Sequence, residues 1–272
     1  MSAKSDQQQK DLIRDRFTRT VEAFGDYAVT YRAQFADTLA KLVSAGPGDR
    51  VVDLACGPGT LALQFARQVR WVCGVDLTPA MLARARSTAR TEGLQNLAFT
   101  LGDAQALPFA EGSVDISVTS YSLHHMPAPA QTIREMARVV KPGGRVGIID
   151  IVVPDEPARA EAANRIEIAR DPSHTRSLGR KDFDTMIAAA GLRILESEVH
   201  GIPRMFDHWM HVAGWHRGDP TYIETRRLME ATMANDFAGF QPRYAAVDAN
   251  SSGKVPDIHM VNTALFLAAE KT

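Results

Sequence analysis

The most informative stretch of the sequence is Val51-Val52-Asp53-Leu54-Ala55-Cys56-Gly57-Pro58-Gly59-Thr60-Leu61-Ala62. An apolar run leads into closely spaced glycines, and a helix-like pattern follows, which is typical of a buried strand, a tight turn and a helix start. Glycines let the backbone pass close to a ligand, and the free N–H groups of a helix start favour polar or anionic groups. The stretch therefore predicts a ligand-binding turn.

Short apolar runs alternate with helix-like segments after this turn. Strands are predicted at residues 50–55, 71–76, 97–101, 114–119, 145–152 and 192–197. Helices are predicted at residues 60–68, 79–92, 130–140 and 181–190. Strands that alternate with helices form a parallel, doubly wound sheet, so the fold class is α/β.

The segments outside this core complete a single domain. Residues 1–10 are polar and aperiodic, which predicts a flexible N-terminus, and residues 11–45 read as N-terminal helices broken near Gly25. The core spans residues 46–200. Residues 203–240 carry methionines and aromatic residues at roughly helical spacing, which predicts a helical lid, and residues 258–269 form a closing strand. One domain of residues 11–272 results.

The composition excludes several classes of protein. The 272 residues include 31 Lys+Arg and 32 Asp+Glu, and this balance disfavours a nucleic-acid partner. No apolar run reaches the ~18 residues of a membrane span, and the N-terminal residues lack the apolar region of a signal peptide. Cys56 and Cys73 make no disulfide framework and read as small buried side chains. A cytoplasmic protein is expected.

Acidic residues lie in or just after the ends of the first three predicted strands. Asp76 ends the second strand, where a carboxylate can accept both hydroxyls of a ribose. Asp53 suits a positively charged ligand and would repel a pyrophosphate. Asp103 can accept from an exocyclic amine such as that of adenine, with Ala104 supplying an N–H. The glycine pattern alone also fits a dinucleotide fingerprint, so a nicotinamide-dependent oxidoreductase stays open.

Five ordered segments carry a family resemblance: DLACGPG (53–59), GVDLTPAML (74–82), GDAQALPF (102–109), SYSLHHMP (120–127) and VVKPGG (139–144). With them the chain resembles the class I S-adenosylmethionine-dependent methyltransferases over roughly residues 20–200. Within that class it is similar to the small-molecule branch of ubiquinone/menaquinone-biosynthesis and natural-product O-methyltransferases. The resemblance implies a Rossmann-like, mostly parallel seven-stranded sheet, S-adenosylmethionine as cofactor and a small-molecule acceptor.

The resemblance also implies contacts for each part of the cofactor. Residues around the glycine turn line the methionine moiety, the acid of the second strand holds the ribose, and the residues after it enclose the adenine. The edge of the adenine meets the residues after the third strand, and a serine ending the fourth strand lies near the sulfonium. A tyrosine segment closes over the cofactor. In chain order these residues are Tyr27, Tyr31, Asp53, Ala55, Gly57, Gly59, Asp76, Leu77, Met81, Asp103, Ala104 and Ser120.

His124 and His125 are the candidate bases for methyl transfer. Methylation of a hydroxyl or an activated carbon removes a proton, and histidine has a suitable pKa. Adjacent residues do not point the same way, so at most one of the pair faces the acceptor. In the resembling sugar O-methyltransferases an HHMP segment supplies the proposed base, and an aspartate corresponding to Asp150 assists. The prediction is that His124 or His125 acts as base, oriented by Asp150.

The acceptor itself stays open. The aromatic lid favours a hydrophobic or ring-bearing acceptor. His208, His211 and His216 have no Cys or close acidic partner, so they are expected to edge the acceptor pocket, and no metal is predicted. O-, N- and C-methylation are not separated, nor is a monomer from a homodimer. A cofactor-binding protein with a regulatory or non-methylating role also stays open, because function lives in the site.

Overall fold

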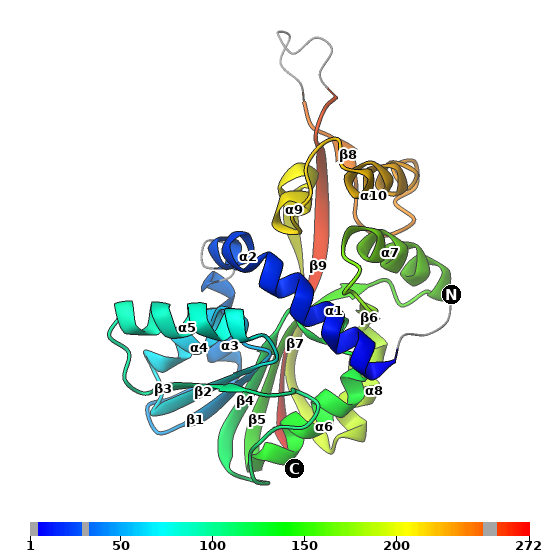
Figure 1. Cartoon of the computed structure of the whole chain (residues 1–272). Helices are drawn as coiled ribbons and strands as arrows, with labels where there is room; N and C mark the ends of the chain where they lie inside the picture. The colour runs from blue at the N-terminus through cyan, green and yellow to red at the C-terminus, as the bar shows by residue number, and fades with distance from the viewer. Residues whose placement is uncertain (1–4, 29–32, 247–254) are drawn as a thin grey trace.

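A mostly parallel sheet forms the centre of the computed structural model, which describes residues 5–28, 33–246 and 255–272 (Figure 1). The strand order is β3-β2-β1-β4-β5-β9-β7. The parallel strands are β1 (Arg50–Leu54), β2 (Trp71–Asp76), β3 (Leu97–Leu101), β4 (Val114–Ser120) and β5 (Val140–Val153). β9 (Ile258–Lys271) runs antiparallel between β5 and β7 (Leu192–Met205).

The doubly wound fold predicted from the sequence is confirmed, with one difference in strand count. Two short strands, β6 (Leu178–Gly179) and β8 (Arg243–Tyr244), pair with β5 and β9 outside the main path. The sheet therefore has nine strands in place of the predicted seven. Both short strands pair with the ends of long strands, where backbone N–H and C=O groups would otherwise lack a partner on that side.

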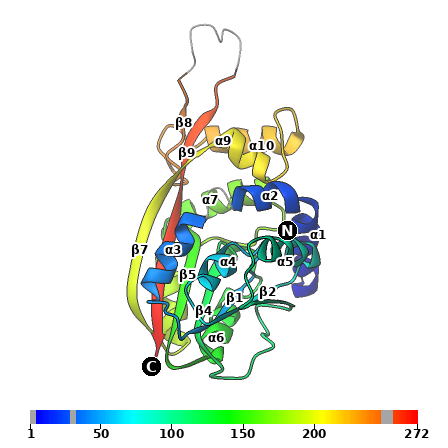
Figure 2. The ribbon, with the colours of Figure 1, turned by 90° about the vertical axis from the view of Figure 1, so that its left-hand side faces the viewer.

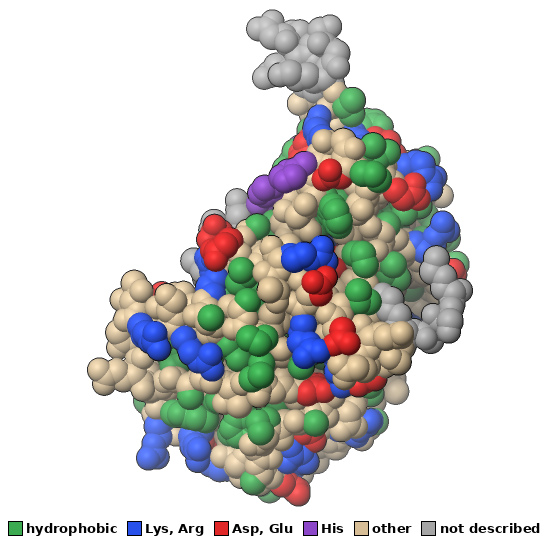
Figure 3. Space-filling model, in the orientation of Figure 1, with side chains coloured by type: hydrophobic (Ala, Val, Ile, Leu, Met, Phe, Trp, Pro, Cys, Tyr) green, Lys and Arg blue, Asp and Glu red, His purple; other side chains and the backbone are tan. Residues whose placement is uncertain are grey.

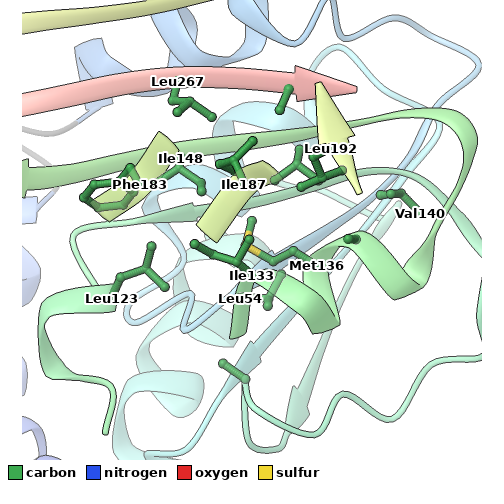
Figure 4. Packing of buried hydrophobic residues seen from close by; sticks show 14 of the residues in the cluster. Leu54, Leu123, Ile133, Met136, Val140, Ile148, Phe183, Ile187, Leu192 and Leu267 are labelled. Carbon is green, nitrogen blue, oxygen red and sulfur yellow. The ribbon is translucent and has the colours of Figure 1, made fainter. Parts of the chain in front are cut away.

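Helices bury both faces of the sheet. On one face, α3 (Ala33–Leu42) and α4 (Thr60–Ala66) contribute to a core with β1 and β4, and α5 (Pro79–Thr91) packs beside β2 and β3. On the other face, α6 (Pro129–Val139) and α8 (Arg180–Ala189) pack against the central strands. Figure 4 shows Ile133, Met136, Phe183 and Ile187 from these two helices directed toward Ile148 and Leu267. Burial on both faces explains the near-continuous apolar runs.

The N-terminal helices begin and break at other points than predicted. Helix α1 (Asp6–Arg19) starts inside the segment expected to be flexible, because Ser5 and Gln8 form a capping box at its first turn. The break lies at Thr20, and α2 (Val21–Tyr27) runs through Gly25. The Arg84 side chain packs where a Cβ of Gly25 would lie, so this glycine allows close packing and does not end a helix.

The final strands carry a second lobe. β7 continues to Met205, beyond its predicted end, because β9 pairs with it from Leu192 onward. The helices of the predicted lid segment therefore begin only at α9 (Phe206–Val212), which α10 (Pro220–Glu230) follows. Both helices pack on α7 (Pro157–Arg170). Figure 2 shows β7 and β9 rising together into this lobe. Within the described residues, no helix has the length and apolarity to cross a membrane.

Candidate active site

The glycine turn after β1 is fixed by close packing. Gly57 and Gly59 have positive φ angles of 55° and 86°, which favour glycine. A Cβ on Gly59 would lie 3.0 Å from the Cβ of Ala85 on α5. The turn therefore lies tightly between β1 and α5, and its backbone borders an open cavity.

Two buried carboxylates hold this turn. Asp53 accepts a hydrogen bond from the Ala62 N–H at 3.1 Å, which joins β1 to the start of α4. Asp76 accepts from the N–H groups of Gly57 and Thr78, both at 2.8 Å. Burial raises the pKa of both carboxyls, and an oppositely charged ligand would stabilise their ionised forms.

The cavity beside the turn, here the glycine-loop cavity, encloses about 880 Å³, counting its mouth. Most residues predicted to bind the cofactor line it, namely Ala55, Gly57, Asp76, Leu77, Met81, Asp103, Ala104 and Ser120. Asp53 and Gly59 are absent from its lining and shape the turn from behind. Tyr27 lines a neighbouring cavity instead, and Tyr31 lies outside the described residues.

Helix α1 supplies lining that the sequence analysis missed. It crosses the ends of the parallel strands in Figure 1 and brings Lys10, Ile13 and Phe17 to the cavity. The Lys10 ammonium lies 2.7 Å from the Asp103 carboxylate. Gln9 donates to the carbonyls of His125 at 3.3 Å and Ser173 at 2.5 Å. The helix therefore forms part of the site.

A second cavity, here the histidine cavity, lies beside the first and spans about 700 Å³ with its open mouth included. The two share Phe17, Phe24, Tyr121 and His125, so their contents would meet there. Its lining comes from α1, α2, β5, α7, β7, α9, β9, the 3-10 turn η2 (Leu123–His125) and adjoining loops. The polar and aromatic residues found only in this lining are Arg16, Tyr27, His124, Glu167, Arg170, Asp171, His174, Arg204, His208, Trp209 and Asn262.

His124 and Asp150 form a buried pair. The His124 Nδ1 is hydrogen-bonded to Asp150 Oδ1, and Asp150 Oδ2 accepts from the Leu123 N–H at 2.7 Å. The carboxylate is 1% exposed. Because Nδ1 is engaged, Nε2 is the ring nitrogen of His124 that stays available to the cavity. The predicted association of Asp150 with this histidine segment is therefore present in the structure.

His125 is held differently. Its Nδ1 lies 3.0 Å from the Ser173 carbonyl, to which it donates in the matching tautomer. Burial, reinforced by the adjacent His124, lowers the pKa of His125 to about 3. Burial also lowers the pKa of His174, whose ring centroid lies 5.4 Å from that of His124. His125 and His174 are therefore neutral at physiological pH.

The histidine cavity is more polar than the aromatic lid segment suggests. Arg16 Nε lies 2.7 Å from Asp171, and Arg170 lies 3.4 Å from Glu167. Burial alone would raise the pKa of Asp171, but nearby charges, above all Arg16, lower it well below its ordinary range. Trp209 does line the cavity beneath the Arg170 guanidinium. Charged pairs line the cavity together with aromatic rings.

The three histidines of the predicted lid do not all line the histidine cavity. His208 lines the histidine cavity, whereas the rings of His211 and His216 lie 5.0 Å apart and are absent from its lining. In the part of the chain that the structure describes, no group of three His, Cys, Asp or Glu residues is arranged to hold a metal ion. Figure 3 shows histidines at the rim of the lobe that β7 and β9 carry, with acidic and basic side chains interspersed over this face of the molecule.

Comparisons with known proteins place the chain in a family. A methyltransferase-domain family model matches residues 45–191. The uncharacterized methyltransferase YcgJ of Bacillus subtilis is 31% identical over 198 residues, which cover 73% of this chain and 78% of YcgJ. The crystal structure of YcgJ aligns with a TM-score of 0.75 and 27% identity, covering 88% of this chain and 98% of YcgJ.

A second relative is named for its acceptor. The 27-O-demethylrifamycin SV methyltransferase of Amycolatopsis mediterranei is 34% identical over 131 residues, or 47% of this chain and 48% of that enzyme.

The fold and the glycine turn define a Rossmann-like protein of the class I methyltransferase type. The chain belongs to the methyltransferase-domain family and is an S-adenosylmethionine-dependent methyltransferase. This assignment decides against the nicotinamide-dependent oxidoreductase. The glycine-loop cavity fits the cofactor, because Asp76 and Asp103 offer acceptors and Leu77 and Met81 offer apolar surface.

Proposed function

We propose that this enzyme methylates a hydroxyl or an activated carbon of a small molecule bound in the histidine cavity, with His124 as general base. The observation that carries this proposal is the buried His124–Asp150 pair, of which His124 lines a cavity that adjoins the glycine-loop cavity. Methyl transfer needs the acceptor atom in line with the methyl group, and two adjoining cavities permit that alignment.

The cofactor, when bound, supplies a methyl group already activated on a sulfonium. His124 Nε2 takes the acceptor proton while Nδ1 donates to Asp150, whose negative charge compensates the resulting imidazolium. Phe17 and Phe24 cover the junction of the cavities and exclude water. His125 is the weaker candidate, because a group with a pKa of about 3 takes up a proton poorly at neutral pH.

The cofactor contacts follow from the lining of the glycine-loop cavity. Asp76 would accept from the ribose hydroxyls, and the adenine would lie between Leu77 and Met81. Asp103 and the Ala104 N–H would meet the adenine edge. The residues nearest the methionine moiety would be Ala55, Gly57 and Ser120, with the Asp53 carboxylate behind them.

One relative supports a hydroxyl acceptor. The methyltransferase of Amycolatopsis mediterranei is named for an O-demethylated acceptor, and its similarity extends over about half of the present chain. A histidine base suits oxygen as the acceptor atom, because a hydroxyl must lose its proton during the transfer.

Single substitutions of the two histidines test the proposal. An acceptor is first found by screening hydroxylated small molecules for release of S-adenosylhomocysteine. His124→Ala should then lower kcat by about 10²- to 10⁴-fold, whereas His125→Ala should keep most of the activity. Binding of S-adenosylhomocysteine, measured by titration calorimetry, should be unchanged in His124→Ala. Equal turnover in His124→Ala and the parent enzyme would refute a histidine base at this position.

Asp150 is a positioning residue in this scheme. Asp150→Asn should lower kcat and shift the acidic limb of the pH–rate profile, because the charge beside His124 is lost. A purely structural role would lower the fraction of folded enzyme and leave the shape of that profile unchanged.

A further inference from the structure

Arg204 differs from the other two arginines of the histidine cavity. Arg16 is paired with Asp171 and Arg170 with Glu167. Across residues 5–28, 33–246 and 255–272, no carboxylate lies within ion-pair distance of Arg204, and its buried Nε has no hydrogen-bond partner. A buried guanidinium donor without an acceptor is costly, so this group needs an explanation.

The Arg204 guanidinium is nonetheless held in place. Its central carbon lies 5.2 Å from the ring centroid of Tyr27, a cation–π contact that orients the group without using its N–H donors. Its charge also reaches His208, where it adds to the effect of burial in lowering the pKa of that imidazole. The cavity therefore contains one positioned positive charge whose donors are free for a ligand.

Asn262 stands beside Arg204 in the sheet. β7 and β9 pair Arg204 with Met260 and Ile202 with Asn262, so the two polar residues are diagonal neighbours on one face. Such neighbours lie about 7–8 Å apart at Cα, within reach of one ligand group. Asn262 is 6% exposed and lines the cavity, and its side-chain amide makes no hydrogen bond to the residues that the structure describes.

We propose that Arg204 and Asn262 form an oxyanion subsite, so that the methyl acceptor carries a carboxylate or phosphate group. This inference rests on the proposed function, because it assigns a substrate class to the same cavity. A planar guanidinium binds such groups through paired N–H donors, and an amide N–H₂ adds a further donor. The remaining cavity charges are compensated by their own partners, so Arg204 selects for a negative ligand.

The test uses small probes and requires no turnover. Benzoate, phenyl phosphate and the neutral benzamide are titrated by calorimetry into enzyme saturated with S-adenosylhomocysteine. The parent enzyme should bind one of the two anions at least about tenfold more tightly than benzamide, as expected for hydrogen bonds to a charged group. The anion that binds more tightly indicates whether the acceptor carries a carboxylate or a phosphate group.

Variants locate the effect. Arg204→Gln should remove the preference for the anion, Arg204→Lys should retain part of it, and Asn262→Asp should weaken anion binding by repulsion. Arg193→Gln is the matched control, since Arg193 lies on the same strand and pairs at the surface with Glu270. This control should bind the probes like the parent enzyme.

Two results would overturn the subsite: no preference for either anion in the parent enzyme, or an unchanged preference in Arg204→Gln. Affinity for S-adenosylhomocysteine is measured for every variant, and it reports folding and cofactor binding independently of the probes. Failure of the proposed methyl transfer would appear as absent turnover with His124 intact, whereas failure of the subsite appears only in the probe titrations.

Discussion

The glycine-loop cavity and the histidine cavity meet at four residues, but they are built in different ways. The first is made mainly of turns that directly follow β1, β2, β3 and β4, with side chains of α1 and α2 laid over them. The second takes most of its side chains from α1, α2, η2, β5, α7, β7, α9 and β9, which span most of the sequence. A cavity made by successive turns has a local sequence signature, whereas one made by tertiary packing has none.

The largest effect is expected at the buried pair that ties α1 to the histidine cavity. Arg16→Met leaves the Asp171 carboxylate, 4% exposed, without its nearest cation, and should lower the free energy of unfolding by about 3–5 kcal/mol. Urea denaturation measures this loss. Arg19→Met is the control on the same helix, because the exposed Arg19–Asp15 pair should be worth under ~1 kcal/mol. Similar losses in both variants would show that the cavity does not depend on this long-range pair.

The next effect concerns the locally encoded cavity. Asp76→Asn replaces the acceptor of two backbone hydrogen bonds and of the proposed ribose contact. We expect about a hundredfold weaker binding of S-adenosylhomocysteine by calorimetry, consistent with the loss of hydrogen bonds to a charged group. Asp115→Asn, at the start of β4, should bind normally, since Asp115 pairs with Lys141 away from the cavity. Normal binding by Asp76→Asn would remove Asp76 from the proposed cofactor contacts.

The smallest effect is a difference in pH dependence. Burial lowers the pKa of His125 to about 3, so the folded protein keeps it neutral while the unfolded chain takes up a proton below pH ~6.5. The stability of the folded state is therefore lost as pH falls through this window, by about 2 kcal/mol between pH 7 and pH 5 for this histidine. Urea unfolding at both pH values should show a smaller loss in His125→Asn. The same loss in variant and parent would mean that His125 already titrates near its ordinary pKa in the folded state.

The same contrast explains what could be predicted. The first three strands and much of the lining of the glycine-loop cavity follow from patterns within a few residues of Gly57, Asp76 and Asp103. Helix α1 had a usable local signal as well, since Ser5 and Gln8 have capping-box spacing, but its polar first turn hid that signal.

The histidine cavity could be predicted only in part. The sequence places His124 and His125 side by side and cannot say which one meets Asp150, because that depends on how η2 turns. Arg204 and Asn262 become neighbours only through the antiparallel register of β7 and β9. Such pairings depend on tertiary contacts between segments far apart in the chain, and no local pattern in a single sequence predicts them.

The position of β9 has a consequence for biosynthesis. This strand follows the other strands of the sheet in the chain, yet it lies between β5 and β7, so β7 cannot join the sheet until residues 258–271 have emerged from the ribosome. The turns that border the glycine-loop cavity are complete long before that point, whereas Asn262 arrives with β9. During synthesis the chain therefore acquires the turns of the glycine-loop cavity first, and the part of the histidine cavity that β9 supplies comes later.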